Sequence, residues 1–278
     1  MTARAGRCGL PGRAAGGSAA PWRGKVKYAM PILLPTLLAI ETSSELASCA
    51  LLRGDAVLSR ASSGVRTHSQ SILPMVQELL AEAGVTLADV DAIAYGSGPG
   101  SFTGVRTACG IAQGLAYGAN LPVVPVVTLD AMALACHQAH GAQRILTVLD
   151  ARMGEVYWAQ YDCQDGLHAV LPPALSAPAG VAPQGDVAGC GNGFSAYAEA
   201  LAALPCAATA DAAIMPHAVQ VAQLARIAFA AGHFVKAADA QPLYLRNKIA
   251  YTSAERLDMQ AAKAAAESAQ CAWRARTP

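Results

Sequence analysis

A glycine-rich stretch at residues 98–106, with the sequence GPGSFTGVR, has the residue types and spacing best suited to chemistry in this chain. It joins an apolar run at 93–95 to a segment with helical periodicity, so it predicts a strand, a turn and the start of a helix. Glycine permits positive φ, and the free backbone N–H groups at a helix start favour a nearby phosphate or carboxylate. The stretch therefore predicts either an anion-binding loop or a tight connection without a ligand. It matches neither the GxxxxGKS/T nor the GxGxxG phosphate-binding pattern.

The polar groups of this loop supply further candidate site residues. Ser101 and Thr103 carry hydroxyls at the expected helix start, and Arg106 can pair with a carboxylate, contact a partner or lie in solvent. The candidates are Gly98, Gly100, Ser101, Thr103, Gly104 and Arg106.

Other residue types point away from metal and protease chemistry. His137 and His140 can share a helix face, but no carboxylate joins them in the sequence, so we expect no metal site. Ser101 lacks the GxSxG spacing of a hydrolase nucleophile, and His68, the nearest histidine in the sequence, has no evident orienting partner. We therefore expect no protease activity. Eight scattered cysteines without a CxxC pair indicate the reduced thiols of a cytoplasmic protein.

The composition indicates a globular protein with an uneven charge distribution. The chain has 278 residues, 54% of them hydrophobic, which is enough for a substantial core in one or two domains. Six of the 20 lysine and arginine residues precede Glu41, the first acidic residue, which leaves 14 cationic and 19 acidic side chains. A body with a net charge of about −5 argues against direct binding of RNA or DNA, because binding to phosphates depends on lysine and arginine.

The N-terminal residues 1–29, rich in Gly, Ala and Arg, predict a disordered basic extension, and Met30 is then a candidate start. The following apolar run contains Pro31 and Pro35 and is too short to span a bilayer, so we expect a buried first strand and no membrane association. A transit peptide is the alternative interpretation of the extension, although serine is scarce there.

The hydrophobic periodicity predicts an α/β fold. Three strands open it as an antiparallel meander, after which strands and helices alternate. We expect a first lobe at 30–140, a second lobe at 141–252 and a flexible Ala-rich tail at 253–278. The expected strands are 36–41, 48–53, 56–61, 91–97, 123–127, 144–149, 156–161 and 187–190; the expected helices are 71–83, 103–117, 129–140, 194–203 and 216–231; a surface excursion is expected at 171–185.

Two of the predicted helices carry notable faces. In the first, Ser71 is the expected N-cap, and Pro74 falls in the first turn, where its missing N–H costs little. In the second, glycines repeat every four residues at 110, 114 and 118 beside an alanine stripe. Glycine in a helix interior costs about 0.8 to 1 kcal/mol relative to alanine, so a close contact is expected to compensate. That contact is either with the protein's own sheet or with another subunit.

Several motifs occur in the order and spacing of one known family. The motifs are IETS at 40–43, ILPMV at 72–76, AYG at 94–96 with the glycine stretch 98–106, DARMGEVY at 150–157, and YLRN at 244–247. On these motifs the sequence resembles the TsaB family, the YeaZ-like proteins of the glycoprotease-like family, which act in the biosynthesis of threonylcarbamoyladenosine in bacterial tRNA. The resemblance covers about residues 36–250 and is weak from 162 to 240.

The resemblance implies an actin-like ATPase (ribonuclease H-like) fold with two lobes, each a mixed sheet flanked by helices. In that superfamily, an acid in the first strand and another at a strand end flank the phosphates and magnesium of a nucleotide. Glu41 and Asp150 match these positions and, with Thr42 and Ser43, are the candidates for a vestigial nucleotide site. The loop after Glu41 lacks the expected glycine, most TsaB sequences have Asp at this position, and Arg152 follows where glycines are expected. The implied cofactor is therefore none, or ATP and magnesium bound weakly.

The resemblance also implies the partners. TsaB proteins pair with TsaD, the catalytic paralogue, and act with the ATPase TsaE to transfer a threonylcarbamoyl group to the adenosine beside the anticodon of tRNAs that read codons beginning with adenine. This chain lacks the HxxxH metal motif of TsaD, which implies a non-catalytic scaffold. It would be cytoplasmic, would contact tRNA only through the complex and could form a homodimer when alone. The candidate interface residues lie on the helices after the meander and the glycine loop: Ile72, Val76, Leu79, Ala108, Gly110, Ala112, Gly114 and Gly118.

The alternative function is an ATP-dependent kinase-like enzyme or ATPase of the same superfamily, in which Glu41 and Asp150 hold magnesium around a nucleotide. Binding of ATP and magnesium that depends on Glu41 would distinguish it from the scaffold.

Overall fold

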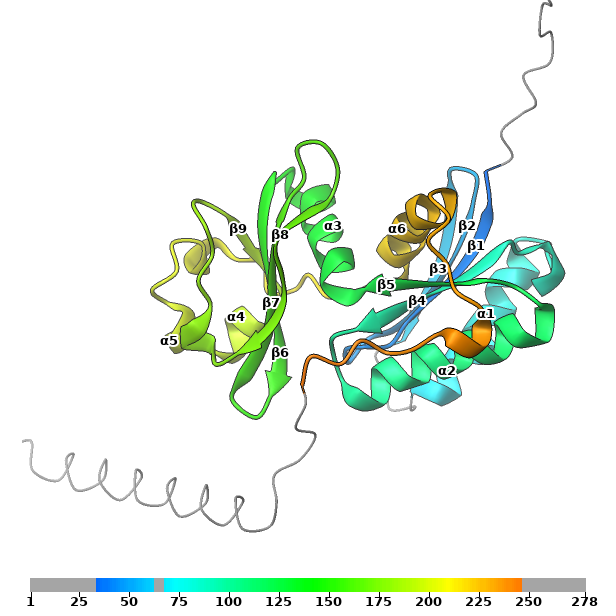
Figure 1. The fold of residues 1–278 in the computed structure, drawn as a ribbon, viewed down its shortest axis with the longest axis horizontal. Helices are drawn as coiled ribbons and strands as arrows, with labels where there is room; N and C mark the ends of the chain where they lie inside the picture. Colours follow the sequence, from blue (N-terminus) through cyan, green and yellow to red (C-terminus); the bar gives the residue numbers. More distant parts are fainter. Residues whose placement is uncertain (1–33, 63–67, 247–278) are drawn as a thin grey trace, which may run out of the picture. The chain divides into compact units, whose positions relative to one another are not determined.

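The computed structural model describes residues 34–62 and 68–246, which contain two mixed β-sheets with helices packed on them (Figure 1). The predicted extension at 1–29 and the predicted tail at 253–278 lie outside the described residues. The strands are β1 (Thr36–Glu41), β2 (Ala47–Arg53), β3 (Ala56–Ser62), β4 (Ala92–Gly98), β5 (Val123–Val127), β6 (Arg144–Arg152), β7 (Glu155–Asp162), β8 (His168–Ser176) and β9 (Ala188–Cys190). The α-helices are α1 (His68–Glu82), α2 (Phe102–Ala119), α3 (Thr128–His140), α4 (Gly193–Ala196), α5 (Ala198–Leu201) and α6 (Ala218–Ala230).

The two sheets repeat one arrangement. In the first, β1, β2 and β3 form an antiparallel meander and β4 pairs parallel with β1, which gives the order β3-β2-β1-β4-β5. In the second, β6, β7 and β8 form the meander and β9 pairs parallel with β6, which gives the order β8-β7-β6-β9. Strands β1 and β6 are therefore equivalent, and each has an acidic residue near its C-terminal end, Glu41 and Asp150. This duplication confirms the expected fold class.

The first sheet is buried on both faces, which explains the nearly continuous apolar run of β1. Successive side chains of a strand point to opposite faces. Leu38 and Ile40 pack in a core with α1 and α2, whereas Leu37 and Ala39 pack in a second core with α6. The second sheet has α3 on one face and Phe194 of α4 on the other.

The C-terminal part of the chain returns to the first sheet (Figure 1). Helix α6 contacts β1, β2, β4 and β5. Residues 235–243 then run along the first lobe, where the Val235 and Val123 backbones bond to each other and Leu243 N donates to Ser97 O at 2.7 Å. The first sheet is thus completed by residues that follow the second sheet in sequence.

The expected strands of the two meanders are confirmed within a few residues, and three other expectations are wrong. Residues 168–176 form β8 where a surface excursion was expected from residue 171, because they pair with β7. Helix α1 begins at His68, so Ser71 is inside the helix and Pro74 lies in its second turn, where it removes a bond to the Gln70 carbonyl. The helix expected at 194–203 is two short helices, α4 and α5.

Candidate functional site

A cavity of about 500 Å³ lies between the two sheets, at the C-terminal ends of the parallel strands β1, β4, β6 and β9. Residues that follow β1, β4 and β9 line it, including Ser43, Gly100 and Asn192, and β6 contributes Asp150. Cavities of this size hold small organic ligands in many proteins. The expected nucleotide-site candidates Ser43 and Asp150 are therefore brought together with the glycine loop.

The glycine loop packs against the protein's own backbone. A Cβ at Gly104 would lie 1.9 Å from the carbonyl oxygen of Thr42, and one at Gly100 would lie 2.5 Å from that of Ser43. The Thr42 hydroxyl donates to the Gly104 carbonyl at 2.7 Å, and Ser101 N donates to the Ser43 carbonyl at 2.7 Å. The glycines thus allow the loop after β1 to lie directly on the start of α2. This geometry favours the tight connection over an anion-binding loop.

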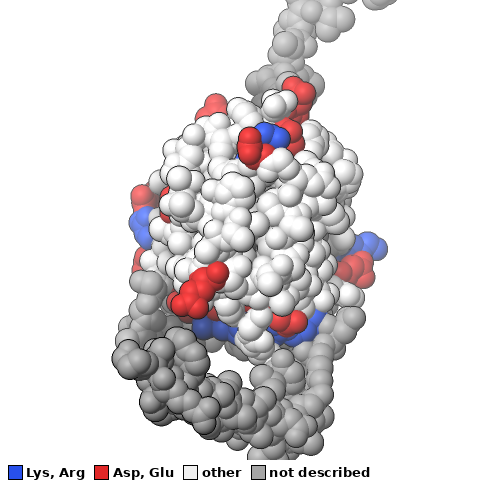
Figure 2. Space-filling model, turned by 90° about the vertical axis from the view of Figure 1, so that its left-hand side faces the viewer, with Lys and Arg blue, Asp and Glu red and all other residues white. Residues whose placement is uncertain are grey.

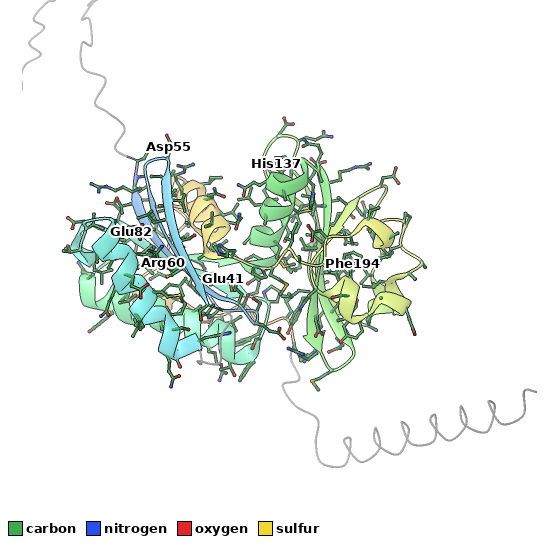
Figure 3. The ribbon with its side chains drawn as sticks, turned by 180° about the vertical axis from the view of Figure 1, so that it is seen from behind. Glu41, Asp55, Arg60, Glu82, His137 and Phe194 are labelled. Carbon is green, nitrogen blue, oxygen red and sulfur yellow. The ribbon has the colours of Figure 1, made fainter. Side chains whose placement is uncertain are left out.

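The carboxyl group of Glu41 is enclosed by the protein. Glu41 is 0% exposed, and Ser43 N donates to its Oε1 at 2.5 Å. Its Oε2 accepts no hydrogen bond from any described residue and lies where a Cβ of residue 96 would be, so only Gly96 leaves room for it. Burial raises the pKa of this carboxyl group, and hydrogen bonds from Ser43 and Thr42 lower it only in part. Figure 3 shows Glu41 at the end of β1 that faces the second lobe, but the side chain does not line the cavity.

The carboxylate of Asp150 lines the cavity, but other groups of the protein already surround it. Its Oδ1 accepts hydrogen bonds from Arg152 N at 2.7 Å and from the Tyr197 hydroxyl at 2.9 Å. The Arg152 guanidinium lies 3.7 Å from Oδ2 and pairs with Glu45 at 2.7 Å. This interaction connects the loop after β1 with the turn after β6.

These positions do not fit a nucleotide held through magnesium. Magnesium requires oxygen ligands in a near-octahedral arrangement, usually including one or two carboxylates. Glu41 is enclosed beneath its loop, and Asp150 faces an arginine. The loop that would approach a phosphate is already packed on Gly104.

The cavity also brings Ser101, His68 and Asp150 together, which the sequence did not predict, but they do not form a catalytic triad. The Ser101 hydroxyl caps α2 by accepting from Gly104 N at 3.5 Å. The His68 Nε2 lies 3.3 Å from the Glu45 carbonyl, and Asp150 accepts its hydrogen bonds from Arg152 N and the Tyr197 hydroxyl. A hydrolase requires a nucleophile bonded to its base and a base bonded to an orienting acid, and these three side chains do not meet that requirement.

Arg106 bonds within the chain at the exposed start of α2. Its Nε donates to the Tyr244 hydroxyl at 2.7 Å, and its guanidinium lies 3.8 Å from the centre of the Phe102 ring. Tyr244 and Arg246 hold the C-terminal segment on the body, since Arg246 also bonds the carbonyl of Ala151 at 3.1 Å. The expected candidate Thr103 is exposed, and its carbonyl accepts from the Thr107 hydroxyl at 2.9 Å.

The expected interface residues separate into two groups. The first group is buried in the protein's own core, so its expected surface role is wrong: Ile72, Val76, Leu79, Ala108 and Ala112. The second group, Gly110, Gly114 and Gly118, is exposed, and a Cβ at any of them would meet no described atom within 4 Å. The open glycines line up on the outer face of α2 near Tyr117, which is 82% exposed.

The cysteines and histidines do not form a metal site among the described residues, where no three metal-ligating side chains come together. A carboxylate does join one histidine, which the sequence did not predict: His140 Nε2 lies 2.9 Å from Asp211. The six cysteines in the described ranges are free and buried. None of the described helices has the length and apolar character needed to cross a membrane.

The repeated meanders, the cavity between the sheet ends and the two strand-end acids define a member of the actin-like ATPase class. A family model described as TsaD, tRNA N6-adenosine threonylcarbamoyltransferase, matches residues 57–275. Two solved structures from Pseudomonas aeruginosa, one titled YeaZ and one titled a protein with similarity to peptidase YeaZ, are each 43% identical to this chain. They cover 76% of this chain and all of their own length, with TM-scores of 0.70 and 0.72.

Curated relatives narrow the class further. The tRNA threonylcarbamoyladenosine biosynthesis protein TsaB of Escherichia coli K12 is 40% identical over 222 residues, which cover 77% of this chain and 96% of the relative. TsaB of Haemophilus influenzae is 36% identical over 228 residues, with 78% and 95% covered. The chain belongs to the TsaB family.

Proposed function

We propose that this protein acts in the biosynthesis of threonylcarbamoyladenosine in tRNA as a non-catalytic scaffold that pairs with TsaD. Its relatives carry TsaB names, and a TsaD family model matches most of its length. The observation that carries the non-catalytic role is the enclosure of Glu41, which is fully buried and bonded to its own loop. A carboxyl group in that position cannot bind a ligand in the cavity without rearrangement of the loop after β1.

The open face of α2 supports the pairing. Gly110 and Gly114 are exposed, and no neighbour among the described residues explains the absence of a side chain. Each glycine lowers helix stability by about 0.8 to 1 kcal/mol relative to alanine, so a close-packed partner would explain them. A shallow hollow beside them is lined by Gly114, Tyr117 and Ala237. On α1, the exposed Leu73 adds apolar surface. We propose that a helix of TsaD packs on this face, and that the isolated chain can form a homodimer through it.

The charge of the second lobe supports contact with tRNA only through the complex. No lysine or arginine occurs from residue 153 to residue 225, whereas six acidic residues do. Figure 2 shows a face of the molecule on which charged side chains are sparse and lie mainly at its margin. Because tRNA phosphates require cationic groups, TsaD and the TsaE ATPase would provide the contacts needed for threonylcarbamoyl transfer.

The decisive experiment is association with TsaD by a variant whose fold is intact. Gly114→Leu adds a side chain into open space, so the purified variant should unfold at or above the wild-type temperature but fail to bind TsaD in a pull-down. Ala230→Leu, at an exposed position of α6, is the matched control and should bind normally. Normal TsaD binding by Gly114→Leu would exclude this face of α2.

Two further measurements test the function and the absence of a cofactor. A TsaB-depleted strain that expresses Gly114→Leu should lack threonylcarbamoyladenosine in its tRNA, whereas Ala230→Leu should restore it. Calorimetric titration of the isolated protein with ATP and magnesium should give no binding, or weak binding unchanged by Glu41→Ala. Micromolar binding of ATP that is abolished by Glu41→Ala would favour the kinase-like alternative. We propose that the protein is cytoplasmic and has no resident cofactor.

A further inference from the structure

The last described residues of the chain cross from the first lobe to the second. Leu243 N donates to the Ser97 carbonyl at 2.7 Å, and the Leu243 carbonyl oxygen lies 2.8 Å from where a Cβ of Gly98 would be. Gly98 has φ of 109°, so both its conformation and this contact require glycine. The next residue, Tyr244, accepts the hydrogen bond from Arg106 of α2. The segment is therefore fixed on the first lobe up to Tyr244.

The following two residues are fixed on the second lobe. Leu245 packs against the core that contains α3 and β6. The Arg246 guanidinium donates to the carbonyls of Ala151 at 3.1 Å and Arg152 at 3.3 Å, and to the Glu155 carboxylate at 2.5 Å. The Arg246 side chain is 15% exposed, which limits screening of these bonds by solvent. The four residues 243–246, here called the strap, all line the cavity between the sheets.

Other contacts also join the two lobes. The chain passes from β5 to α3, and α3 packs on α6 through hydrogen bonds among Gln138, Gln220 and Gln223. In Figure 1 this contact lies on one side of β5, and the strap, coloured orange, lies on the α2 side. The pair of Arg152 and Glu45 also spans the lobes, but both side chains are more than two-thirds exposed, so it contributes little.

We propose that the strap fixes the relative position of the two lobes and the width of the cavity, with Tyr244 as its anchor on the first lobe and Arg246 as its anchor on the second. In a two-lobed protein, a ligand bound between the lobes often holds them together. Here the chain itself supplies a continuous bridge at the cavity. The lobes are thus held in one arrangement without a ligand. This inference concerns the isolated protein and is independent of the pairing with TsaD.

The test compares Arg246→Ala with Arg226→Ala in the full-length chain. Arg226 is a matched control, because it also bonds a backbone carbonyl and a carboxylate, those of Gly54 and Asp55, but entirely within the first lobe. Two readouts apply. Hydrogen exchange at the Leu243 amide reports release of the strap. The second readout is the separation of the lobes, measured by electron spin resonance. It uses spin labels attached to ketone-bearing amino acids that are introduced at the exposed positions 81 and 200.

Loss of charge-assisted hydrogen bonds should raise the open population about tenfold or more. Arg246→Ala should therefore speed exchange at Leu243 by that factor and broaden the distance distribution, whereas Arg226→Ala should change neither. Arg246→Lys should change exchange and distances less than the alanine variant, because a single nitrogen, Nη2, makes all three bonds and an ammonium also carries three donors on one nitrogen. Exchange and distances like those of wild type in Arg246→Ala would overturn the proposal. If that variant fails to fold, Glu155→Gln, which removes only the carboxylate partner, should give a smaller change in the same direction, and no change would equally overturn it.

Discussion

Glycine-to-alanine changes should have opposite effects in the first turn of α2, at Gly104, and in its interior, at Gly110 and Gly114. At Gly110 and Gly114 a Cβ meets no described atom within 4 Å, so each change should stabilise the protein by about 0.8 to 1 kcal/mol through helix propensity alone. At Gly104 a Cβ would lie 1.9 Å from the Thr42 carbonyl oxygen, about 1.1 Å closer than the 3.0 Å that real contacts keep. The backbone after β1 would have to move, and overpacking of this kind costs about 1 to 3 kcal/mol.

Urea denaturation followed by circular dichroism measures these differences in the free energy of unfolding. The double variant Gly110→Ala with Gly114→Ala should gain about 2 kcal/mol and unfold about 4 to 8 °C higher than wild type. Gly104→Ala should lose stability in the same experiment, although it lies in the same helix. An equal gain for Gly104→Ala would refute the argument that the loop after β1 lies directly on this glycine.

Three further changes test hydrogen-bonded polar groups. Glu41→Gln should stabilise the protein at neutral pH. Because the folded-state pKa of Glu41 is raised, wild-type stability falls as the pH rises from the unfolded-state pKa through the folded-state pKa. The gain in the free energy of unfolding should therefore vanish in acid, and a gain independent of pH would contradict this reasoning. Ser101→Ala removes the cap that accepts from Gly104 N and should cost about 0.5 to 1 kcal/mol in urea denaturation, with Ser101→Asp expected to retain most of the stability. Tyr161→Phe leaves the half-buried Asp130 carboxylate without the 2.7 Å bond from Tyr161, which should lower the free energy of unfolding by about 1 to 3 kcal/mol; no loss would show that water replaces the hydroxyl.

The first meander and strands β6 and β7 of the second followed from local sequence, because their turn residues act over a few positions, whereas β8 did not, since its Pro-rich sequence indicated a surface excursion. Strands β1 and β5 have the expected bounds. The return of α6 and of residues 235–243 to the first sheet did not follow, since nothing in the apolar face of α6 specifies which sheet it covers. Pairings such as that between Tyr95 and the Gln241 carbonyl, 146 positions apart, depend on the assembled fold.

The candidate site was predicted in position but not in accessibility. Glu41 and Asp150 do lie at equivalent strand ends, yet the enclosure of Glu41 depends on Gly96 in the neighbouring strand. A glycine inside an apolar strand is a recognised signal of close approach, and at Gly96 it was available in the sequence. For α2, helical periodicity identified two stripes but not which one faced the sheet. The alanine stripe does so, and the glycine stripe faces outward.

The placement of α6 has a consequence for how the polypeptide matures during synthesis. The Ala218 amide bonds the Ser48 hydroxyl across 170 positions, and α6 covers one whole face of the first sheet. Until the ribosome has synthesised α6, the apolar side chains of that face are not covered by this helix. The first sheet therefore cannot complete its packing before α6 has been made. Contacts of such long range also imply slow folding, and a product that terminates before α6 would expose Leu37, Leu52 and Val124 to aggregation and proteolysis.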